Sequence, residues 1–228
     1  MSIDLVDTDA SSAEAARQGS GYEAWVPELS VTETWQESSS SGALLRRQVV
    51  FVPSLDPWES VDSARAAVRA GAPGVLRLNL RSTKGALPLT EWALDPLPAV
   101  CEREGYALAL DYGPTGTVPL TELAAFACSA PEVALLVLGD RVCEQPAVWR
   151  LLDCCPNVLL QVTDQTAPAS LAAGVGTFGA HRFVFGSRGS ATGADAVLLA
   201  ALEADDQVAL TSGNARALDT LEWRQRWL

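Results

Sequence analysis

The sequence predicts an α/β fold, a compact (β/α)8 TIM barrel that takes up residues 1–228 as one domain. Two observations predict it. Short aliphatic and β-branched runs recur along the chain, and each is followed by a stretch with helical periodicity, which is typical of a parallel sheet with crossover helices. Eight such units fit into 228 residues only if the loops are short, so we expect a trimmed barrel.

The predicted strands are short apolar runs that recur along the chain. The clearest is 133–138, which contains no polar residue, as suits a parallel strand covered on both faces. The expected strands are 3–7, 22–26, 48–53, 74–80, 107–112, 133–138, 157–163 and 182–187.

The predicted helices lie between these strands. In one of them, Val61, Ala64 and Val68 are spaced to form one apolar stripe, and Pro57 suits a first helical turn. Near the C-terminus, Trp223 and Trp227 share one helix face, and we expect them to cover the barrel rather than bind a partner. The expected helices are 60–70, 119–128, 145–153, 168–174, 192–202 and 205–228.

The N-terminal part is the least regular. Serines 38–41, within 35–45, predict a solvated loop followed by a short helix. Two alternatives stay open for residues 1–45: they complete the barrel, or they leave it distorted and open. An open barrel would expose strand edges, which proteins usually cover, and would favour an obligate partner.

Composition excludes several classes of function. The chain has 28 acidic and 16 basic residues, a formal charge of −12, which opposes binding to nucleic acid and to anionic membranes. No apolar run approaches the roughly 20 residues that span a bilayer, and no secretion signal is visible, so we expect a cytoplasmic protein. The five cysteines should be reduced and packed; the alternative is a metal held by Cys143 with Cys154 or Cys155.

Three short motifs do not predict the function that their letters suggest. Residues 174–179 match G-x-G-x-x-G, but they stand between a helix and a strand and predict a helix-ending loop. Ser187 lacks the full nucleophile elbow, G-x-S-x-G, and has no histidine expected nearby. Asn214 is expected to cap the final helix.

Residues 178–187, together with 213–216, resemble the last strand and last helix of amidohydrolase-superfamily barrels of the amidohydrolase-2 type. Residues 91–97 and 149–160 are similar to that family too. The resemblance covers most of the chain, weakly before residue 45, and implies a TIM barrel related to metal-dependent hydrolases.

The resemblance also implies that the metal ligands of that family are lost here. In the family, one or two divalent metals are held by an H-x-H on strand 1, a histidine on each of strands 5 and 6, and an aspartate after strand 8. Those positions hold Val6 and Thr8, Asp111, Val137, and Arg188. We expect no metal and no cofactor, although an all-carboxylate magnesium site, opposed by Arg188, is a remaining alternative.

The residue count agrees with this expectation. A catalytic zinc site usually uses three His, Cys or carboxylate ligands, and the chain has one histidine, His181. His181 precedes the last predicted strand, so we expect it at the N-terminal face of the barrel with a structural role.

Function in such barrels lies at the C-terminal ends of the strands. Arg188 is expected to pair with Asp111 across this mouth, its guanidinium occupying the place of a metal; the alternative is that each faces solvent alone. The predicted catalytic residues are Asp111, Arg188, Asp164 and Tyr112, and the predicted ligand-binding residues are Arg81, Arg141, Asn79, Gln161 and Ser187.

Three functions remain open. The first is a non-catalytic accessory or regulatory subunit, partnered by a homologous amidohydrolase or by a second copy of itself. The second is a metal-independent hydrolase, lactonase or lyase acting on a small carboxylate, with Asp111 or Asp164 as general base and Tyr112 as donor. The third is a protein that binds a small anion through its arginines without turnover.

Overall fold

The computed structural model describes residues 5–7, 22–28, 37–38, 44–51, 57–69, 73–78, 81–82, 85–86, 88–111, 119–139, 144–163, 165–186, 199–220 and 223. For residues 5–7, 22–28, 37–38, 44–51, 57–60, 67, 81–82, 85–86, 91–92 and 111 it describes the backbone alone.

Eight of the described strands form one parallel ladder that follows the order of the chain. They are β1 (Leu5–Asp7), β2 (Tyr22–Glu28), β4 (Leu44–Phe51), β5 (Val75–Leu78), β8 (Ala107–Asp111), β9 (Leu135–Leu138), β10 (Val158–Val162) and β11 (Phe183–Phe185). Each overlaps one predicted strand. Chain-order parallel pairing is the topology of a (β/α)8 barrel, so the predicted fold class is confirmed.

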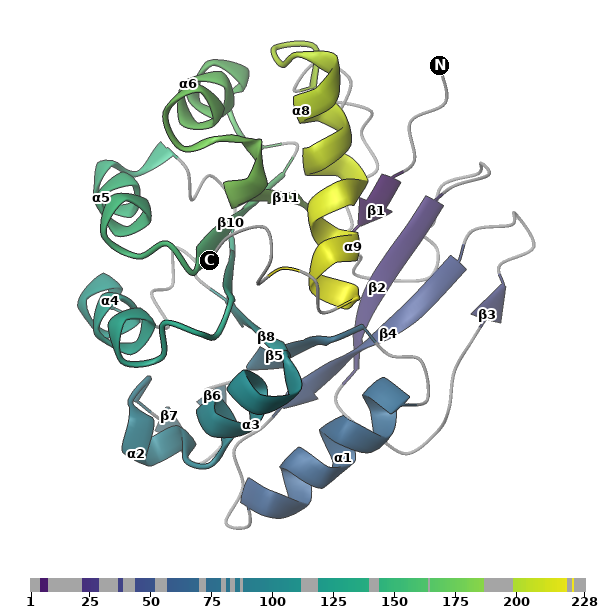
Figure 1. Ribbon diagram of the computed structural model, residues 1–228, viewed down its shortest axis with the longest axis vertical. Helices are drawn as coiled ribbons and strands as arrows, with labels where there is room; N and C mark the ends of the chain where they lie inside the picture. The colour runs from purple at the N-terminus through teal and green to yellow at the C-terminus, as the bar shows by residue number, and fades with distance from the viewer. Residues whose placement is uncertain are drawn as a thin grey trace.

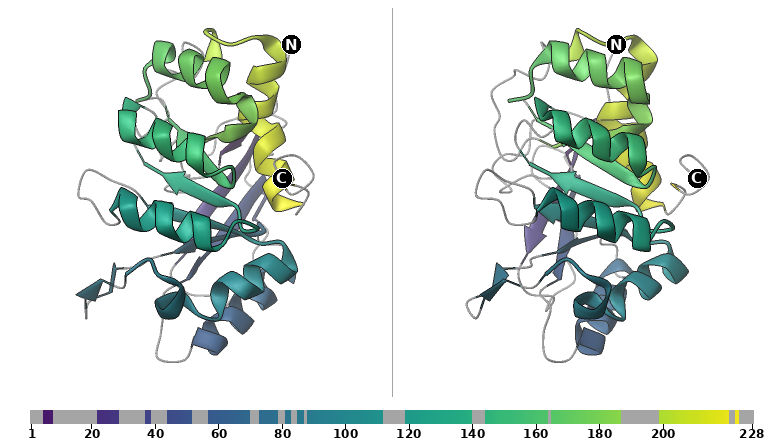
Figure 2. Two further views of the ribbon diagram at one scale, coloured as in Figure 1. Left: turned by 60° about the vertical axis from the view of Figure 1, so that its left-hand side comes forward. Right: turned by 90° about the vertical axis from the view of Figure 1, so that its left-hand side faces the viewer.

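The helices cover the outside of this ladder (Figure 1), and α4, α5 and α6 stack side by side (Figure 2). Helices α1, α5 and α6 each begin with proline, whose fixed φ and missing N–H suit a first turn. None of the described helices is long and apolar enough to cross a membrane. They are α1 (Pro57–Arg69), α2 (Glu91–Leu94), α3 (Leu97–Glu104), α4 (Leu120–Ser129), α5 (Pro146–Cys154), α6 (Pro168–Phe178), α8 (Ala204–Val208), the π-helix η4 (Ala209–Gly213) and α9 (Asn214–Asp219). Most of the predicted helix 192–202 lies outside the described residues.

The short helix predicted to follow serines 38–41 is wrong. The short strand β3 (Glu37–Ser38) pairs antiparallel with β4, which already begins at Leu44. The polar residues 46–48 interrupted the apolar run and hid the first half of this strand from a search for buried parallel strands. The hairpin of β6 (Arg81–Ser82) and β7 (Gly85–Ala86) was not predicted either.

Side chains alternate between two cores along the described strands, because successive residues of a strand point to opposite faces. Leu108, Leu110 and Leu135 belong to an outer core with the helices. Ala107, Ala109 and other residues at the alternating positions form a second, inner core. The inner core consists of Val75, Ala107, Ala109, Ala134, Leu136, Leu138, Leu159, Val184, Ala215, Ala217, Leu218 and Trp223.

The C-terminal segment fills the inner core from the lower face, where the strands begin. Trp223 is 0% exposed and packs among the small side chains of Ala107 and Ala109. Its Nε1–H donates to the carbonyl of Gly105, just before β8, at 2.9 Å. The prediction that this tryptophan covers the barrel is confirmed, whereas Trp227 lies outside the described residues.

The π-helix η4 joins the two ends of the ladder. Its backbone lies against both β1 and β11, and the C-terminal helical segment occupies the space between these strands in Figure 1. Leu210, Thr211 and Ser212 of η4 are buried there. This helix therefore covers the end-strand edges that an open barrel would otherwise expose.

Two buried side chains satisfy backbone carbonyls at the lower face. Asn157 donates from Nδ2 to the carbonyls of Ala127, Ala130 and Val133 at 3.0–3.1 Å. Arg182 donates to the carbonyls of Leu152, Cys155 and Val158 at 2.7–3.2 Å, and burial lowers the pKa of its guanidinium. Carbonyls at helix and loop ends thus receive hydrogen bonds from buried side chains.

Asn214 has a comparable role, and its prediction as a helix cap is wrong. Gly213 before it has helical dihedral angles, because η4 runs into α9 without a break. The Asn214 side chain instead donates from Nδ2 to the carbonyls of Ala180 and Phe183, both at 2.8 Å. The C-terminal helix is thereby tied to the start of β11.

We expect Trp223→Ala to lower the free energy of unfolding by about 3–5 kcal/mol, because it empties the lower part of the inner core. Trp223→Phe, which keeps most of the packing and loses the hydrogen bond to Gly105, should cost about 1–2 kcal/mol. Trp149→Phe, on the half-buried outer side of α5, is the control and should cost less than either. Urea unfolding followed by circular dichroism measures the free energy of unfolding of all three variants. Equal decreases for Trp223→Ala and Trp149→Phe would contradict the role of Trp223 in filling the inner core.

Two of the glycines in 174–179 lie within α6, so the predicted loop begins later than expected. A Cβ on Gly174 would stand 2.8 Å from Cζ of Phe183, whose ring is 1% exposed, while a Cβ on Gly176 would meet nothing within 4 Å. Gly179 ends the helix with φ of 84°, a conformation that favours glycine.

These two glycines make a matched pair. Gly174→Ala should destabilise the protein by about 1–3 kcal/mol, because the buried Phe183 ring cannot move away. Gly176→Ala should stabilise it by about 0.5–1 kcal/mol through helix propensity. Thermal unfolding of both variants checks the signs, and a stabilising Gly174→Ala would show that α6 packs differently.

Candidate functional site

The candidate site lies where the parallel strands end. Register places Asp111, the last residue of β8, beside Leu138 at the end of β9. Gln161 of β10 is beside Val184 of β11. Because carboxyl ends of parallel strands share one edge, the ends of β8, β9, β10 and β11 lie at the same mouth.

Most of the predicted side chains fall outside the described residues. The backbone of Asp111 ends β8, and Arg81 begins β6, where it pairs with Ala86. The expected pairing of Asp111 with Arg188 stays a prediction. Those outside the described residues are Asn79, Tyr112, Arg141, Asp164, Ser187 and Arg188.

Gln161 is the one predicted site residue whose side chain is described. It is 0% exposed, and its Oε1 accepts a hydrogen bond from the backbone N–H of Gly139 at 3.0 Å. Gly139 directly follows β9, so Gln161 fixes the start of the loop that leaves this strand. The contact shows a positioning role; binding of a ligand by Gln161 stays a prediction.

Three hydrogen bonds to side-chain oxygens hold the loop after β10. Thr166 accepts at Oγ1 from the N–H of Thr163, and Thr163 accepts at Oγ1 from the N–H of Gln165. Glu144 Oε1 accepts from the N–H of Ala167, immediately before α6. The residues that flank the predicted Asp164 are therefore fixed within a tight turn.

Arg77 is a candidate that the sequence reasoning missed. It is the third of the four residues of β5 and is half-buried, whereas Val75, Leu76 and Leu78 are buried. Register sets it beside Ala109, which belongs to the inner core. The alternation of β5 therefore directs Arg77 to the inner face, beside a small alanine that leaves room for its long side chain.

A signal for Arg77 was present in the sequence. A single arginine interrupts an otherwise apolar run in 74–78, and a charge inside a buried strand is rare unless it has a partner or a function. The run was counted as a strand without asking which face its charge would occupy.

The single histidine lies at the other end of the barrel. His181 belongs to the 3-10 helix η3 (Ala180–Arg182), directly before β11 and hence at the lower face. Partial burial lowers the pKa of His181, and the neighbouring charge of Arg182 lowers it further. Since the chain has no other histidine, none reaches the mouth.

The donor groups do not fit the histidine-held metal that barrels of the suspected family use. No histidine is available at the mouth, and the described residues contain no cluster of three or more His, Cys, Asp or Glu that could hold an ion. Catalytic zinc uses such clusters.

We expect Gln161→Met to lower the free energy of unfolding by about 1–3 kcal/mol, because it leaves the Gly139 N–H without its acceptor in a buried position. Gln165→Met, at an exposed position in the loop after β10, is the matched control. It should change the free energy of unfolding by less than about 0.5 kcal/mol. Hydrogen exchange at the Gly139 amide should accelerate only in Gln161→Met; unchanged protection would contradict the assigned role.

No family model matches the sequence, and no curated protein matches it. Solved structures do match. An uncharacterised TIM-barrel protein of Bordetella bronchiseptica is 15% identical with a TM-score of 0.63, over 91% of this chain and 80% of that one.

Two further structures carry functional names. A putative 2-pyrone-4,6-dicarboxylic acid hydrolase of Pseudomonas putida is 18% identical with a TM-score of 0.62, over 97% of this chain and 99% of that one. An amidohydrolase 2 of Bifidobacterium longum subsp. infantis is 17% identical with a TM-score of 0.55, over 81% of this chain and 72% of that one. At these identities the likeness shows a shared fold, and it confirms the predicted resemblance at that level.

Proposed function

We propose that this chain, which has the barrel fold of amidohydrolase-type enzymes, binds a small carboxylate at its mouth without a histidine-held metal. The observation that carries the proposal is Arg77, a cation that strand alternation places on the inner face of β5, the same face as the buried Val75. Ligands of such barrels bind at the strand ends, and Arg77 is one residue from the end of β5.

A guanidinium at this position suits a carboxylate. Its planar fork can donate two parallel hydrogen bonds to the two oxygens, and such charge-assisted bonds are roughly twice as strong as neutral ones. The partial burial of Arg77 reduces screening by water, so the attraction is stronger than at the surface.

The overall charge makes a local cluster of cations necessary. A protein of formal charge −12 repels anions at long range, so an anionic ligand needs positive groups where it binds. Arg81, Arg141 and Arg188 follow the ends of β5, β9 and β11 in the sequence. We propose that they add to the charge of Arg77 at the mouth.

The class of ligand has independent support. The Pseudomonas putida structure, whose whole length this chain nearly covers, is named for the hydrolysis of a pyrone dicarboxylic acid. We therefore take planar ring carboxylates as the first ligands to test.

Turnover of the bound carboxylate is a second candidate, favoured by the position of Asp111. It lies on the strand next to Arg77 and two residues further along in register, since Arg77 is beside Ala109. A base there would be adjacent to an anion held by Arg77. In this proposal Asp111 or Asp164 activates water, and Tyr112 donates to the developing negative charge.

The accessory-subunit hypothesis is supported by the absence of a histidine at the mouth. A barrel without a histidine at its mouth cannot build the usual metal site, which suits a non-catalytic partner of an active relative. Trp223 cannot anchor a partner protein, because it is 0% exposed inside the chain's own barrel. Mass spectrometry of proteins that co-purify from the native host tests this role.

Carboxylate binding predicts thermal stabilisation. We expect 2-pyrone-4,6-dicarboxylate or phthalate, near saturation, to raise Tm by about 5–10 °C, because a ligand at 100 times its Kd adds about 2.7 kcal/mol to the stability of a chain of this size. Dimethyl phthalate, which lacks the charges, should raise it by less than about 1 °C. Differential scanning fluorimetry with a ligand titration measures both.

Matched arginine variants locate the site. Arg77→Gln should abolish the shift, and Arg188→Gln should weaken it, whereas Arg150→Gln, whose side chain is 85% exposed on α5, should retain it. Circular dichroism first confirms that each variant is folded. Full retention of the shift in Arg77→Gln, or equal shifts with the diester, would refute binding at the inner face.

Chromatography of the same mixtures after incubation tests turnover. Loss of the probe that depends on protein and is abolished in Asp111→Asn would establish the enzymatic candidate. Binding without loss of any probe would leave the protein as a carboxylate binder.

A further inference from the structure

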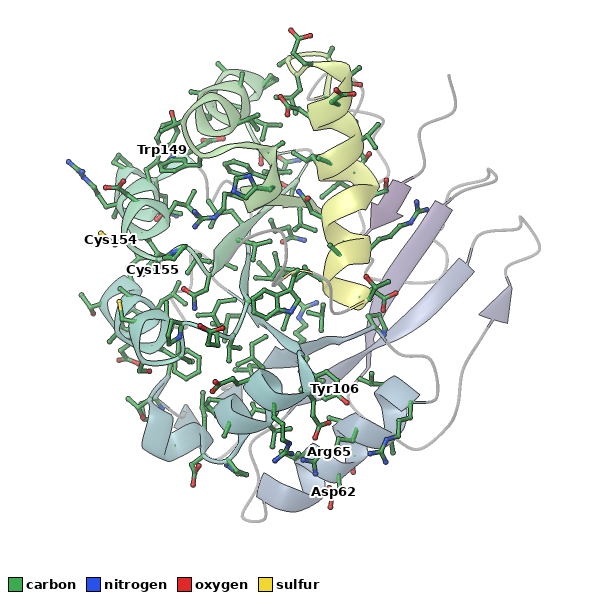
Figure 3. All side chains as sticks on the ribbon, in the orientation of Figure 1. Asp62, Arg65, Tyr106, Trp149, Cys154 and Cys155 are labelled. Atoms are coloured by element: carbon green, nitrogen blue, oxygen red, sulfur yellow. The ribbon has the colours of Figure 1, made fainter. Side chains whose placement is uncertain are left out.

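Two cysteine sulfurs meet at the lower face, away from the mouth. Sγ of Cys128, near the end of α4, lies 3.9 Å from Sγ of Cys155, which directly follows α5. Cys128 is exposed, whereas Cys155 is 2% exposed. The chain contains no C-x-x-C spacing, and the expectation that these cysteines are all packed away is wrong for Cys128 and Cys154, which are exposed. Figure 3 labels Cys154 and Cys155, at the end of α5 and directly after it.

The two backbones that carry these sulfurs are held in place by the carbonyl network. Asn157, two residues after Cys155, donates to Ala127, the residue before Cys128, and also to Ala130 beyond it. Arg182 donates to the carbonyl of Cys155 itself at 2.8 Å. The segments on both sides of the sulfur pair are thereby fixed, so their contact does not depend on a mobile loop.

We propose that Cys128 and Cys155 are a reversible disulfide site, closed by a two-electron oxidant such as a hydroperoxide and opened by thiols. A disulfide needs a sulfur–sulfur distance of about 2.05 Å, so the sulfurs must approach by roughly 2 Å, which rotations of the two side chains supply. The bond would join α4 covalently to the segment after α5, across the link that Asn157 already makes by hydrogen bonds.

Exposure assigns the order of the chemistry. The Cys128 thiolate attacks one oxygen of the peroxide, the O–O bond breaks, and the released hydroxide or alkoxide takes up a proton; Cys128 is now a sulfenic acid. The Cys155 sulfur then attacks the sulfur of Cys128, the S–O bond breaks, and water leaves with the Cys155 proton. Two thiols are oxidised and one peroxide is reduced.

Burial supports this division of roles. Desolvation first, and then the hydrogen bond and charge of Cys128, raise the pKa of Cys155 to about 11. A thiol held protonated and shielded from solvent is a poor first target for peroxide but is well placed to react with an oxidised sulfur in contact with it.

Tryptic mapping of the native protein tests the proposal. Trypsin cleavage places Cys128 in residues 104–141 and Cys155, with Cys154, in residues 151–182. After treatment with about a tenfold excess of hydrogen peroxide and alkylation of free thiols, we expect these two peptides linked with the loss of two hydrogens. Dithiothreitol should separate them. Performing the oxidation in urea should reduce the link at least tenfold, since the fold supplies the contact.

Three variants identify the sulfurs. Cys128→Ser, at an exposed position that tolerates serine, and Cys155→Ala should each abolish the link. Cys154→Ser, its exposed neighbour, should form it at a rate within about twofold of the parent protein. Failure of the folded parent protein to form the link, persistence of the link in Cys155→Ala, or its loss in Cys154→Ser would each overturn the proposal.

Discussion

The enclosed face of the sheet imposes the main constraint on this structure. Parallel strands buried on both sides present every second side chain to the inside, and that space must be filled. The alanines on β8 leave enough space for one large ring, and Trp223 supplies the ring. The position of the C-terminal segment follows from this packing.

The same constraint separates the two ends of the molecule. Below, Asn157 and Arg182 bind carbonyls, and Trp223 closes the interior. Above, Arg77 places a charge on the inner face of β5, one residue before that strand ends. Trp223 thus closes the lower end, the upper end carries the proposed carboxylate site, and the sulfur pair lies at the closed end.

Sequence patterns predicted the eight strands and the confirmed fold class because apolar runs of parallel strands survive without knowledge of their partners. These patterns failed where pairing with distant strands determines the structure. Strand β4 starts four residues earlier than its predicted start at 48, because its first residues pair with β2 on one side and β3 on the other, and an apolar run in the sequence does not reveal such pairing. Among candidate site residues, Gln161 was found from its place on a strand, but its bond to Gly139 depends on a contact with another strand. Arg77 was missed because an apolar run does not indicate on which face of the strand its one charged side chain lies.

The position of Trp223 in the chain bears on how the protein reaches its fold. Its hydrogen bond joins residues 118 apart in sequence, and β5, β8 and β9 line the space that it fills. On the ribosome, the strands therefore emerge before the side chain that completes their interior. Until residue 223 is released the inner alanines face an unfilled space, so the final packing must form after synthesis of the barrel strands, through contacts of high sequence separation that form slowly.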